Sequence, residues 1–253
     1  MIFNIIASGS KGNVSVIKSN NTSILIDFGK SKRRVESGLS NIGLTLEDIN
    51  AVFFTHEHSD HTSNLQVVED KEIYAPLSVL KKFNLKYNEE NIIKPYKEVI
   101  VGDLIILPLP LSHDAEETFG YVISDNKEKL CIITDTGLVT EKNMEYLKDL
   151  DYIILESNYD EEMLFNSDRP NYLIQRIISD KGHLSNKECG YYLSQIVSKR
   201  TKEIVLGHIS QDCNNPSVAL STIKEVLISI NGFVPEVKFS VAGQDNEVIG
   251  GNK

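Results

Sequence analysis

The sequence Thr-His-Glu-His-Ser-Asp-His most constrains how this chain can fold, because it follows directly on the apolar run Ala51–Phe54. That run predicts a buried strand, which delivers three imidazoles and a carboxylate to one end of a sheet. In an extended or turn-like segment His56 and His58 share one side, because alternate residues face the same way. Asp60 and His61, beyond the turn, then point toward a second ion. Three of the six histidines in 253 residues lie in this segment, which favours a metal site over a solvated polar loop.

Imidazole and carboxylate ligands together suit zinc, manganese or iron(II).

The chain is long enough to bury a full core, and its 41% hydrophobic and 25% charged residues are typical of a globular protein. No apolar stretch approaches the length of a membrane span, and the N-terminus lacks the basic flank of a signal peptide. Three separated cysteines form no C-x-x-C pair or disulfide framework. The sequence therefore predicts a cytoplasmic protein that does not contact membranes.

The net charge of −10, from 26 basic and 36 acidic residues, disfavours non-specific binding to a polyanion. It does not exclude a nucleic-acid substrate, because divalent cations invert the local sign of the charge at a site.

Strands and helices are predicted to alternate along both halves of the chain. Apolar runs predict strands at 2–7, 14–18, 24–27, 51–54, 73–75, 98–101, 104–109, 119–124, 129–134, 151–155, 203–206 and, as a closing edge strand, 237–241. Helical patterns cover 31–42, 63–69, 77–83, 140–150, parts of 160–178, 186–199 and 217–229. This pattern indicates an α/β fold in which two mixed sheets pack together and helices cover their outer faces. We expect one domain over 1–253, with two halves that divide near residue 110 and share a core.

The other candidate ligands share one local context, because each follows an apolar, strand-like run. His113, Asp135 and His208 come directly after such runs, and so does Asp27. Strand ends that converge on one rim place polar side chains on a rigid scaffold. One such histidine alone is more often structural, but several in a chain with so few histidines favour shared metal binding.

These residues, in this order, resemble the metallo-β-lactamase superfamily, whose fold is an αβ/βα four-layer sandwich with a dinuclear metal site. The resemblance covers essentially the whole chain. It implies that one ion is held by His56, His58 and His113. It implies that a second ion is held by Asp60, His61 and His208, that Asp135 bridges the two ions, and that Asp27 orients the ligands from beneath.

Four further segments are similar to the YycJ (WalJ) type of bacterial protein within that superfamily. They are 7–13 (ASGSKGN), 112–115 (SHDA), 156–160 (ESNYD) and 182–186 (GHLSN). This resemblance implies a metal-dependent nuclease with 5′ exonuclease activity on DNA. The 182–185 stretch is also similar to the histidine loop of tRNase Z. The chain has no inserted domain like that of RNase J and no Gly-rich basic arm like that of tRNase Z.

His183 is the histidine that the implied ligand set does not use. Gly182 permits a tight turn before it, and Ser185 with Glu188 forms a capping box that begins a helix. Backbone N–H groups at a helix N-terminus favour an anion such as phosphate. We expect His183 to contact the scissile phosphate or to protonate the leaving oxygen. The alternative is a capped helix with a surface histidine.

Four residues are candidates for substrate binding: Ser10, Asn13, Asn158 and Ser185. Segment 8–13 lacks the spacing of a phosphate-binding P-loop, so a tight turn between the first two strands is its simpler interpretation. Near the strand ends this turn can still line a substrate groove. Asn158 is predicted at the rim of the site, with an ordinary loop position as the alternative.

The predicted function is that of a dinuclear metal-dependent hydrolase in which two Zn²⁺ or Mn²⁺ ions, or Fe²⁺, bridge and activate a hydroxide. We expect Asp60, Asp135 and His183 to be catalytic. A phosphodiesterase or nuclease is favoured, acting on nucleic acid or a small phosphodiester, with DNA and its 5′ end preferred. The alternative is a glyoxalase II-type thioesterase or a lactonase, which the acidic net charge favours slightly. A di-iron redox protein and a structural metal module fit less well. The oligomeric state is not predicted.

Overall fold

Two mixed sheets form the centre of the computed structural model, which describes residues 1–252. The six-stranded sheet has the order β13-β1-β2-β3-β4-β5 and contains β1 (Ile2–Ala7), β2 (Val14–Lys18), β3 (Ser23–Ile26), β4 (Ala51–Phe53), β5 (Glu72–Tyr74) and β13 (Val248–Gly251). The seven-stranded sheet has the order β12-β11-β10-β9-β8-β7-β6 and contains β6 (Val99–Val101), β7 (Leu104–Pro110), β8 (Phe119–Ser124), β9 (Lys129–Ile133), β10 (Tyr152–Glu156), β11 (Glu203–Gly207) and β12 (Lys238–Val241). Each sheet joins antiparallel pairs to parallel ones, in the first at β3 and in the second at β9.

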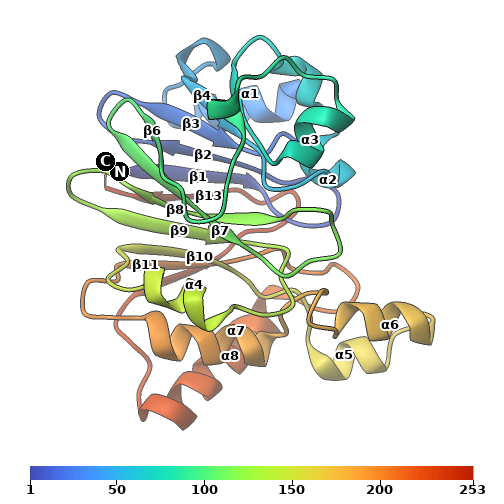
Figure 1. Cartoon of the computed structure of the whole chain (residues 1–253). Coiled ribbons are helices and arrows are strands. Elements are labelled where there is room, and N and C mark those ends of the chain that lie inside the picture. The colour runs from blue at the N-terminus through green and yellow to red at the C-terminus, as the bar shows by residue number, and fades with distance from the viewer. Residues whose placement is uncertain (253) are drawn as a thin grey trace.

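Helices cover the outer face of each sheet, so the molecule has four layers (Figure 1). Beside the first sheet lie α1 (Lys32–Ser40), α2 (Ser59–Thr62) and α3 (Leu77–Lys82). Beside the second sheet lie α4 (Glu141–Tyr146), α7 (Asn186–Ile196) and α8 (Pro216–Asn231). A pair of short helices, α5 (Glu161–Phe165) and α6 (Asn171–Ile177), projects to one side. The predicted fold class, two mixed sheets flanked by helices, is confirmed.

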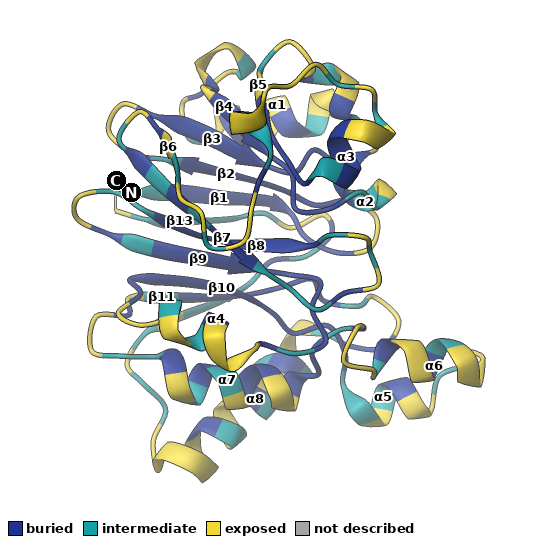
Figure 2. Cartoon of the chain, viewed as in Figure 1, coloured by how far each residue is buried: buried dark blue, intermediate teal, exposed yellow. Residues whose placement is uncertain are grey.

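Buried residues follow the layers of the fold (Figure 2). Their apolar side chains form three large clusters and a smaller fourth one at α5 and α6. Between the sheets, residues such as Phe3 and Tyr152 pack edge to face, with ring centroids 5.5 Å apart. A second cluster lies under α1 and α3, and a third lies under α7 and α8, whose buried faces include Leu193 and Leu227. Central strands such as β3, β4 and β10 are therefore buried on both faces, which explains why they appear as continuous apolar runs in the sequence, whereas the edge strands β6 and β12 are partly exposed.

Most predicted elements are present with small differences at their ends, but two helix predictions are wrong and one strand is missed. The expected helix at 63–69 is only a 3₁₀ turn at Leu65–Val67, and the α-helix of that region is α2, inside the histidine-rich segment. The helix expected at 140–150 ends at Tyr146. β13 is not predicted at all, because its Gly250-Gly251 pair obscures the strand pattern; it pairs antiparallel with β1.

The strands bring the candidate site residues to one edge of the sandwich. β3 and β11 end immediately before Asp27 and His208, β9 ends two residues before Asp135, β4 ends three residues before His56, and β10 ends at Glu156. Asp27, Asp135 and His208, which follow β3, β9 and β11, adopt left-handed backbone conformations with φ of 60°, 59° and 53°. This conformation is uncommon for residues other than glycine, and it turns the chain sharply as it leaves each strand.

The chain passes from one sheet to the other between β5 and β6, and β13 returns to the first sheet. A single domain over 1–253 with halves divided near residue 110 stays a prediction. Among the described residues, no helix combines the length and apolar character needed to cross a membrane.

Candidate metal centre

All six histidines of the chain meet at the edge of the sandwich where these strands end. Five imidazoles form a closed ring in which neighbouring centroids lie 4.1 to 6.4 Å apart, in the order His56, His61, His208, His183 and His113. The sixth, His58, lies against two of them. Half of the histidines come from the loop after β4, and half follow strands and helices of the second sheet. The site therefore lies across both sheets.

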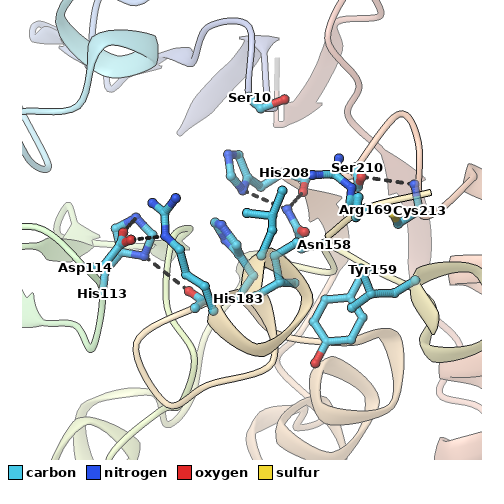
Figure 3. Close-up of a pocket in the computed structure, with 15 residues that line it drawn as sticks. Ser10, His113, Asp114, Asn158, Tyr159, Arg169, His183, His208, Ser210 and Cys213 are labelled. Carbon is cyan, nitrogen blue, oxygen red and sulfur yellow. Dashed lines mark hydrogen bonds and ion pairs between the residues drawn. The ribbon is translucent and has the colours of Figure 1, made fainter. Parts of the chain in front are cut away.

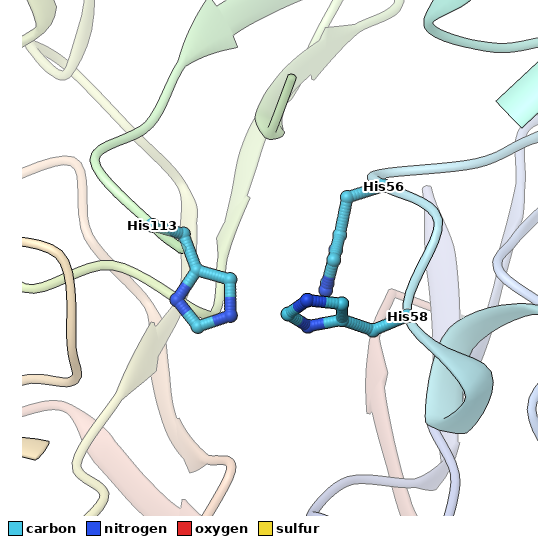
Figure 4. Close-up of side chains that lie close together, drawn as sticks. All are labelled: His56, His58 and His113. Carbon is cyan, nitrogen blue, oxygen red and sulfur yellow. The ribbon is translucent and has the colours of Figure 1, made fainter. Parts of the chain in front are cut away.

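The first group of possible ligands is His56, His58 and His113 (Figure 4). One ring nitrogen from each lies within 4.8 Å of the others. Figure 4 shows the histidine after β7 facing the two that follow β4. Nδ1 of His113 lies 3.2 Å from the carbonyl of Gly182, which fixes the ring and leaves Nε2 for the centre. This is the group that the sequence predicts around one ion.

The second group, also within 4.8 Å, contains Asp60, His61, Asp135 and His208. Asp135 lies between the two groups. Its Oδ2 is 3.2 Å from Nε2 of His61, and its Oδ1 is 3.4 Å from Nε2 of His208 and 3.9 Å from Nε2 of His113. A carboxylate in this position can touch ions in both groups, as the bridging prediction requires.

Asp27 lies beneath the cluster, almost fully buried. Its Oδ2 accepts a 2.7 Å hydrogen bond from Nδ1 of His61, and its Oδ1 accepts one from the backbone N–H of Thr55. The Thr55 hydroxyl donates its single hydrogen to Asp27 and lies 2.9 Å from Nδ1 of His56. Nδ1 of His56 is therefore the donor in that contact, and its Nε2 is free to bind a cation.

Glu156 is a site residue that reasoning from the sequence did not assign. It is fully buried, and its Oε1 accepts hydrogen bonds from Nδ1 of His183 (2.7 Å) and Nδ1 of His208 (2.8 Å). Its position after the apolar residues of β10 is the same signal that identified Asp135 and His208. A third acidic group of possible ligands contains Glu156 and His183. Because their contact is a hydrogen bond, we assign this group to ring orientation rather than to a third ion.

The electrostatics differ between the two ligand groups. In the first group, burial lowers the pKa of His56 and of His113, so these rings favour the neutral form, whereas the second group favours positive charge. Burial opposes protonation of His61, but the charges of Asp27 and Asp135 outweigh burial and raise its pKa well above the ordinary value. Burial is likewise outweighed at His208, where Asp135 is the largest favourable charge and the pKa rises to about 10. For Asp135 burial opposes ionisation, yet the charges of His208 and His61 hold its pKa well below the usual range. A divalent cation would replace protons in this acidic pocket.

Three buried polar atoms of the centre have no hydrogen-bond partner among the described residues: Nε2 of His56, Nε2 of His208 and Oδ2 of Asp135. An unpaired buried polar atom costs free energy, and native proteins seldom retain one. All three atoms carry lone pairs, and together they come from both ligand groups. The residues present therefore fit divalent cations.

A cavity of about 190 Å³ opens beside the centre (Figure 3). His113, His183 and His208 line it, together with two of the predicted substrate-binding residues, Ser10 and Asn158. Asn158 is 9% exposed, and its amide donates a 2.8 Å hydrogen bond to the His208 carbonyl.

The other two predicted substrate-binding residues lie elsewhere. The Asn13 amide lies 3.0 Å from Nε2 of His61 and 3.2 Å from Oδ2 of Asp60, within the second ligand group. Ser185 is buried outside the cavity lining, and its hydroxyl accepts from the N–H of Glu188 as the N-cap of α7. The capping box predicted there is present.

The chain belongs to the beta-lactamase superfamily, because its residues 22–209 match the beta-lactamase superfamily domain. The fold agrees. The metallo-β-lactamase fold protein YhfI from Bacillus subtilis superposes with a TM-score of 0.74 at 16% identity, over 98% of this chain and 99% of that one. With this family and this cluster of ligands, the chain is a metal-dependent hydrolase.

Two curated relatives are similar over most of their length. Exodeoxyribonuclease YycJ of Bacillus anthracis is 31% identical over 233 residues, which cover 89% of this chain and 88% of the relative. Exodeoxyribonuclease WalJ of Streptococcus pneumoniae is 32% identical over 231 residues, which cover 87% of this chain and 86% of the relative. The predicted resemblance to the YycJ/WalJ type is confirmed.

Proposed function

We propose that this protein is a DNA exonuclease that hydrolyses phosphodiester bonds from the 5′ end of a strand, with two divalent cations at its centre. The observation that carries the proposal is the convergence of all six histidines on one cavity, in a chain whose relatives over most of its length are named exodeoxyribonucleases. Zn²⁺ and Mn²⁺ both suit the donor set, and Fe²⁺ remains compatible with it.

In the proposed site His56, His58 and His113 hold one cation, and Asp60, His61 and His208 hold the other, with Asp135 shared between them. When bound, the cations supply Lewis acidity, which lowers the pKa of water and neutralises charge on the phosphoryl oxygens. Asp27 and Glu156 hold the histidine rings in the tautomer that presents Nε2 to the centre, because each accepts from an Nδ1 atom. Asn13 fixes Asp60 beside His61.

His183 is the proposed general acid. Its Nδ1 donates to Glu156, so the carboxylate orients the ring with Nε2 toward the cavity. The side chain is 20% exposed and lines the cavity, where a substrate oxygen can reach the ring. In the reaction the P–O bond to the leaving nucleotide breaks, and the oxygen of a water that gives up one proton to solvent joins the phosphorus. The leaving 3′ oxygen takes a proton from His183, and solvent restores that proton after the nucleotide leaves.

The test is an assay of purified protein with Mn²⁺ or Zn²⁺ on 5′-phosphorylated DNA, RNA, bis(p-nitrophenyl) phosphate and S-lactoylglutathione. We expect release of mononucleotides from DNA. Hydrolysis of the thioester alone would replace the proposal with a glyoxalase II-type activity. For the acid role, we expect His183→Ala to lose most turnover on DNA while retaining its metal. Wild-type turnover of this variant on every phosphodiester would exclude that role.

A further inference from the structure

The cavity beside the centre has a second wall that the proposed chemistry does not use. Residues of α5, α6 and the loop between them form this wall, including the apolar side chains of Leu173 and Ile177, which pack on the fully buried Leu164 behind them. At about 190 Å³, the cavity is far larger than a single water molecule requires. A wall of this kind cannot bind a phosphate, but it can contact a sugar or a base. The cavity thus has room and apolar surface for more than the scissile group.

Two arginines line the same cavity, although the chain has a net charge of −10. Arg176 pairs with Asp114, which is the one carboxylate among the residues that line the cavity. Arg169 makes a 2.8 Å contact with Asp212 through one terminal nitrogen. Its Nε–H is buried without a hydrogen-bond partner among the described residues. That nitrogen is closed to solvent, so a ligand must meet the exposed part of the guanidinium. The side chain is 28% exposed, and its second terminal nitrogen makes no hydrogen bond among the described residues. The terminal N–H groups of a guanidinium form a planar fork that can bind a phosphate.

The arrangement in Figure 3 separates these groups along the cavity. His183 lies between Arg169 and Ser210 on one side of the view and His113 and Asp114 on the other. Arg169 also lies in the loop between two short helices that project from the sandwich, and its partner Asp212 lies in the loop that follows β11 and contains His208. A group bound by Arg169 would therefore occupy the cavity on the far side of His183 from His113.

We propose that this cavity receives the terminal nucleotide of the DNA strand and that Arg169 binds its 5′ phosphate, an inference that rests on the proposed function. His183 protonates the 3′ oxygen of the departing nucleotide, so the cavity that His183 lines is on the departing side. In digestion from the 5′ end, that nucleotide carries the terminal 5′ phosphate. Its sugar and base then contact Leu173 and Ile177, while the phosphate pairs with the unused donors of Arg169. Arg169 determines specificity for the end of the strand.

The test compares initial rates on two single-stranded DNA oligonucleotides of one sequence, one with a 5′ phosphate and one with a 5′ hydroxyl, in Mn²⁺. We expect the wild-type protein to prefer the phosphorylated strand by about tenfold, equal to about 1.4 kcal/mol. In Arg169→Gln this ratio is expected to fall to about one, and in Arg169→Lys, which keeps the charge without the planar fork, to an intermediate value. Arg33→Gln, at an exposed arginine outside the cavity, is the matched control and should keep the wild-type ratio.

Each outcome decides the inference. A wild-type ratio near one overturns it without any variant, and so does a wild-type ratio in folded Arg169→Gln. If Arg169→Gln does not fold, Arg169→Lys decides instead, because an unchanged ratio there contradicts the need for a planar fork. DNA digestion that ignores the 5′ phosphate refutes the inference and leaves the proposed function intact. A protein that digests no DNA but cleaves S-lactoylglutathione refutes both.

Discussion

The carboxylate of Glu156 accepts hydrogen bonds from four directions, and a glutamine in its place cannot accept all of them. Oε1 faces the Nδ1 atoms of His183 and His208, at 2.7 and 2.8 Å. Oε2 faces the backbone N–H groups of Thr136 and Leu184, at 2.9 and 3.5 Å. A glutamine has the same shape but one oxygen and one NH₂ group. Whichever way the amide is turned, its NH₂ group meets two donors.

The expected magnitude follows from those two mismatched donors. Each buried donor left without a partner costs about 1–3 kcal/mol, so the pair costs about 2–6 kcal/mol in total. When the mismatch falls on the imidazoles, part of this energy appears as weaker metal binding, because the rings are no longer held with Nε2 toward the centre. Partners of metal-bound histidines typically contribute 10–100-fold to metal affinity or activity, about 1.4–2.8 kcal/mol.

The assay is a titration of metal-free protein with Mn²⁺ or Zn²⁺, followed by rates on DNA at saturating metal. We expect Glu156→Gln to bind metal about 10–100-fold more weakly and to react more slowly even when loaded, because His183 has also lost its carboxylate. Glu225→Gln, at an exposed position of α8, makes the same chemical change away from the site and should behave as wild type. Unchanged affinity and rate in Glu156→Gln would refute the reasoning that this carboxylate positions both rings.

Three further predictions concern the metal, the close packing of the histidine loop and the response to acid. Removing metal with EDTA should lower the Tm of the wild-type protein by about 5 °C or more, because ligand binding at 100 times Kd stabilises the folded state by about 2.7 kcal/mol. In Asp135→Asn the Tm difference between metal-loaded and metal-free protein should nearly vanish. The control variant Asp70→Asn, at an exposed position, should keep that difference. A Cβ on Gly29 would lie 1.6 Å from the backbone oxygen of Asp60, so Gly29→Ala should lower the Tm by about 6–12 °C (about 3 kcal/mol). Gly243→Ala should leave the Tm unchanged, because the nearest atom to a Cβ at that position is 3.8 Å away. Burial opposes ionisation of Glu128, but hydrogen bonds from Lys202 and Tyr152 outweigh it and lower the pKa of Glu128 from 4.5 to about 2. Its contribution to stability is therefore present above about pH 4.5 and is lost as the pH falls toward 2. Glu128→Gln should flatten the decline of Tm over that window, and a decline as steep as in Glu225→Gln would contradict the assignment.

The parallel, buried strands were the part of the fold best predicted from the sequence. Their apolar runs are continuous because both faces are covered, and the polar residue after each run marks where the strand ends. The same signal found Asp27, Asp135 and His208. Glu156 also follows an apolar run, but the implied ligand set is complete without it, so the sequence alone assigns it no role.

Other features of the structure have no local sequence pattern that predicts them. β13 is stabilised by pairing with β1 at the opposite end of the chain, and its two glycines give it no strand pattern of its own. The helix expected after the histidine loop shortened to a 3₁₀ turn because the loop itself begins the helix at Ser59. The sequence carries no pattern that singles out Arg169 within the region 160–178, where helices are expected. Only the folded arrangement of α5 and α6 places it against the cavity.

The left-handed backbone at Asp27, Asp135 and His208 affects how such sites should be probed by mutagenesis. Alanine scanning at these positions removes a functional side chain and also forces a conformation that alanine disfavours, so two separate losses are merged in one measurement. Asparagine tolerates that conformation far better and keeps a similar volume. Asparagine replacements at the two aspartates therefore isolate the loss of charge. Wherever a metal ligand follows a strand in a left-handed backbone conformation, replacement by asparagine is more informative than replacement by alanine.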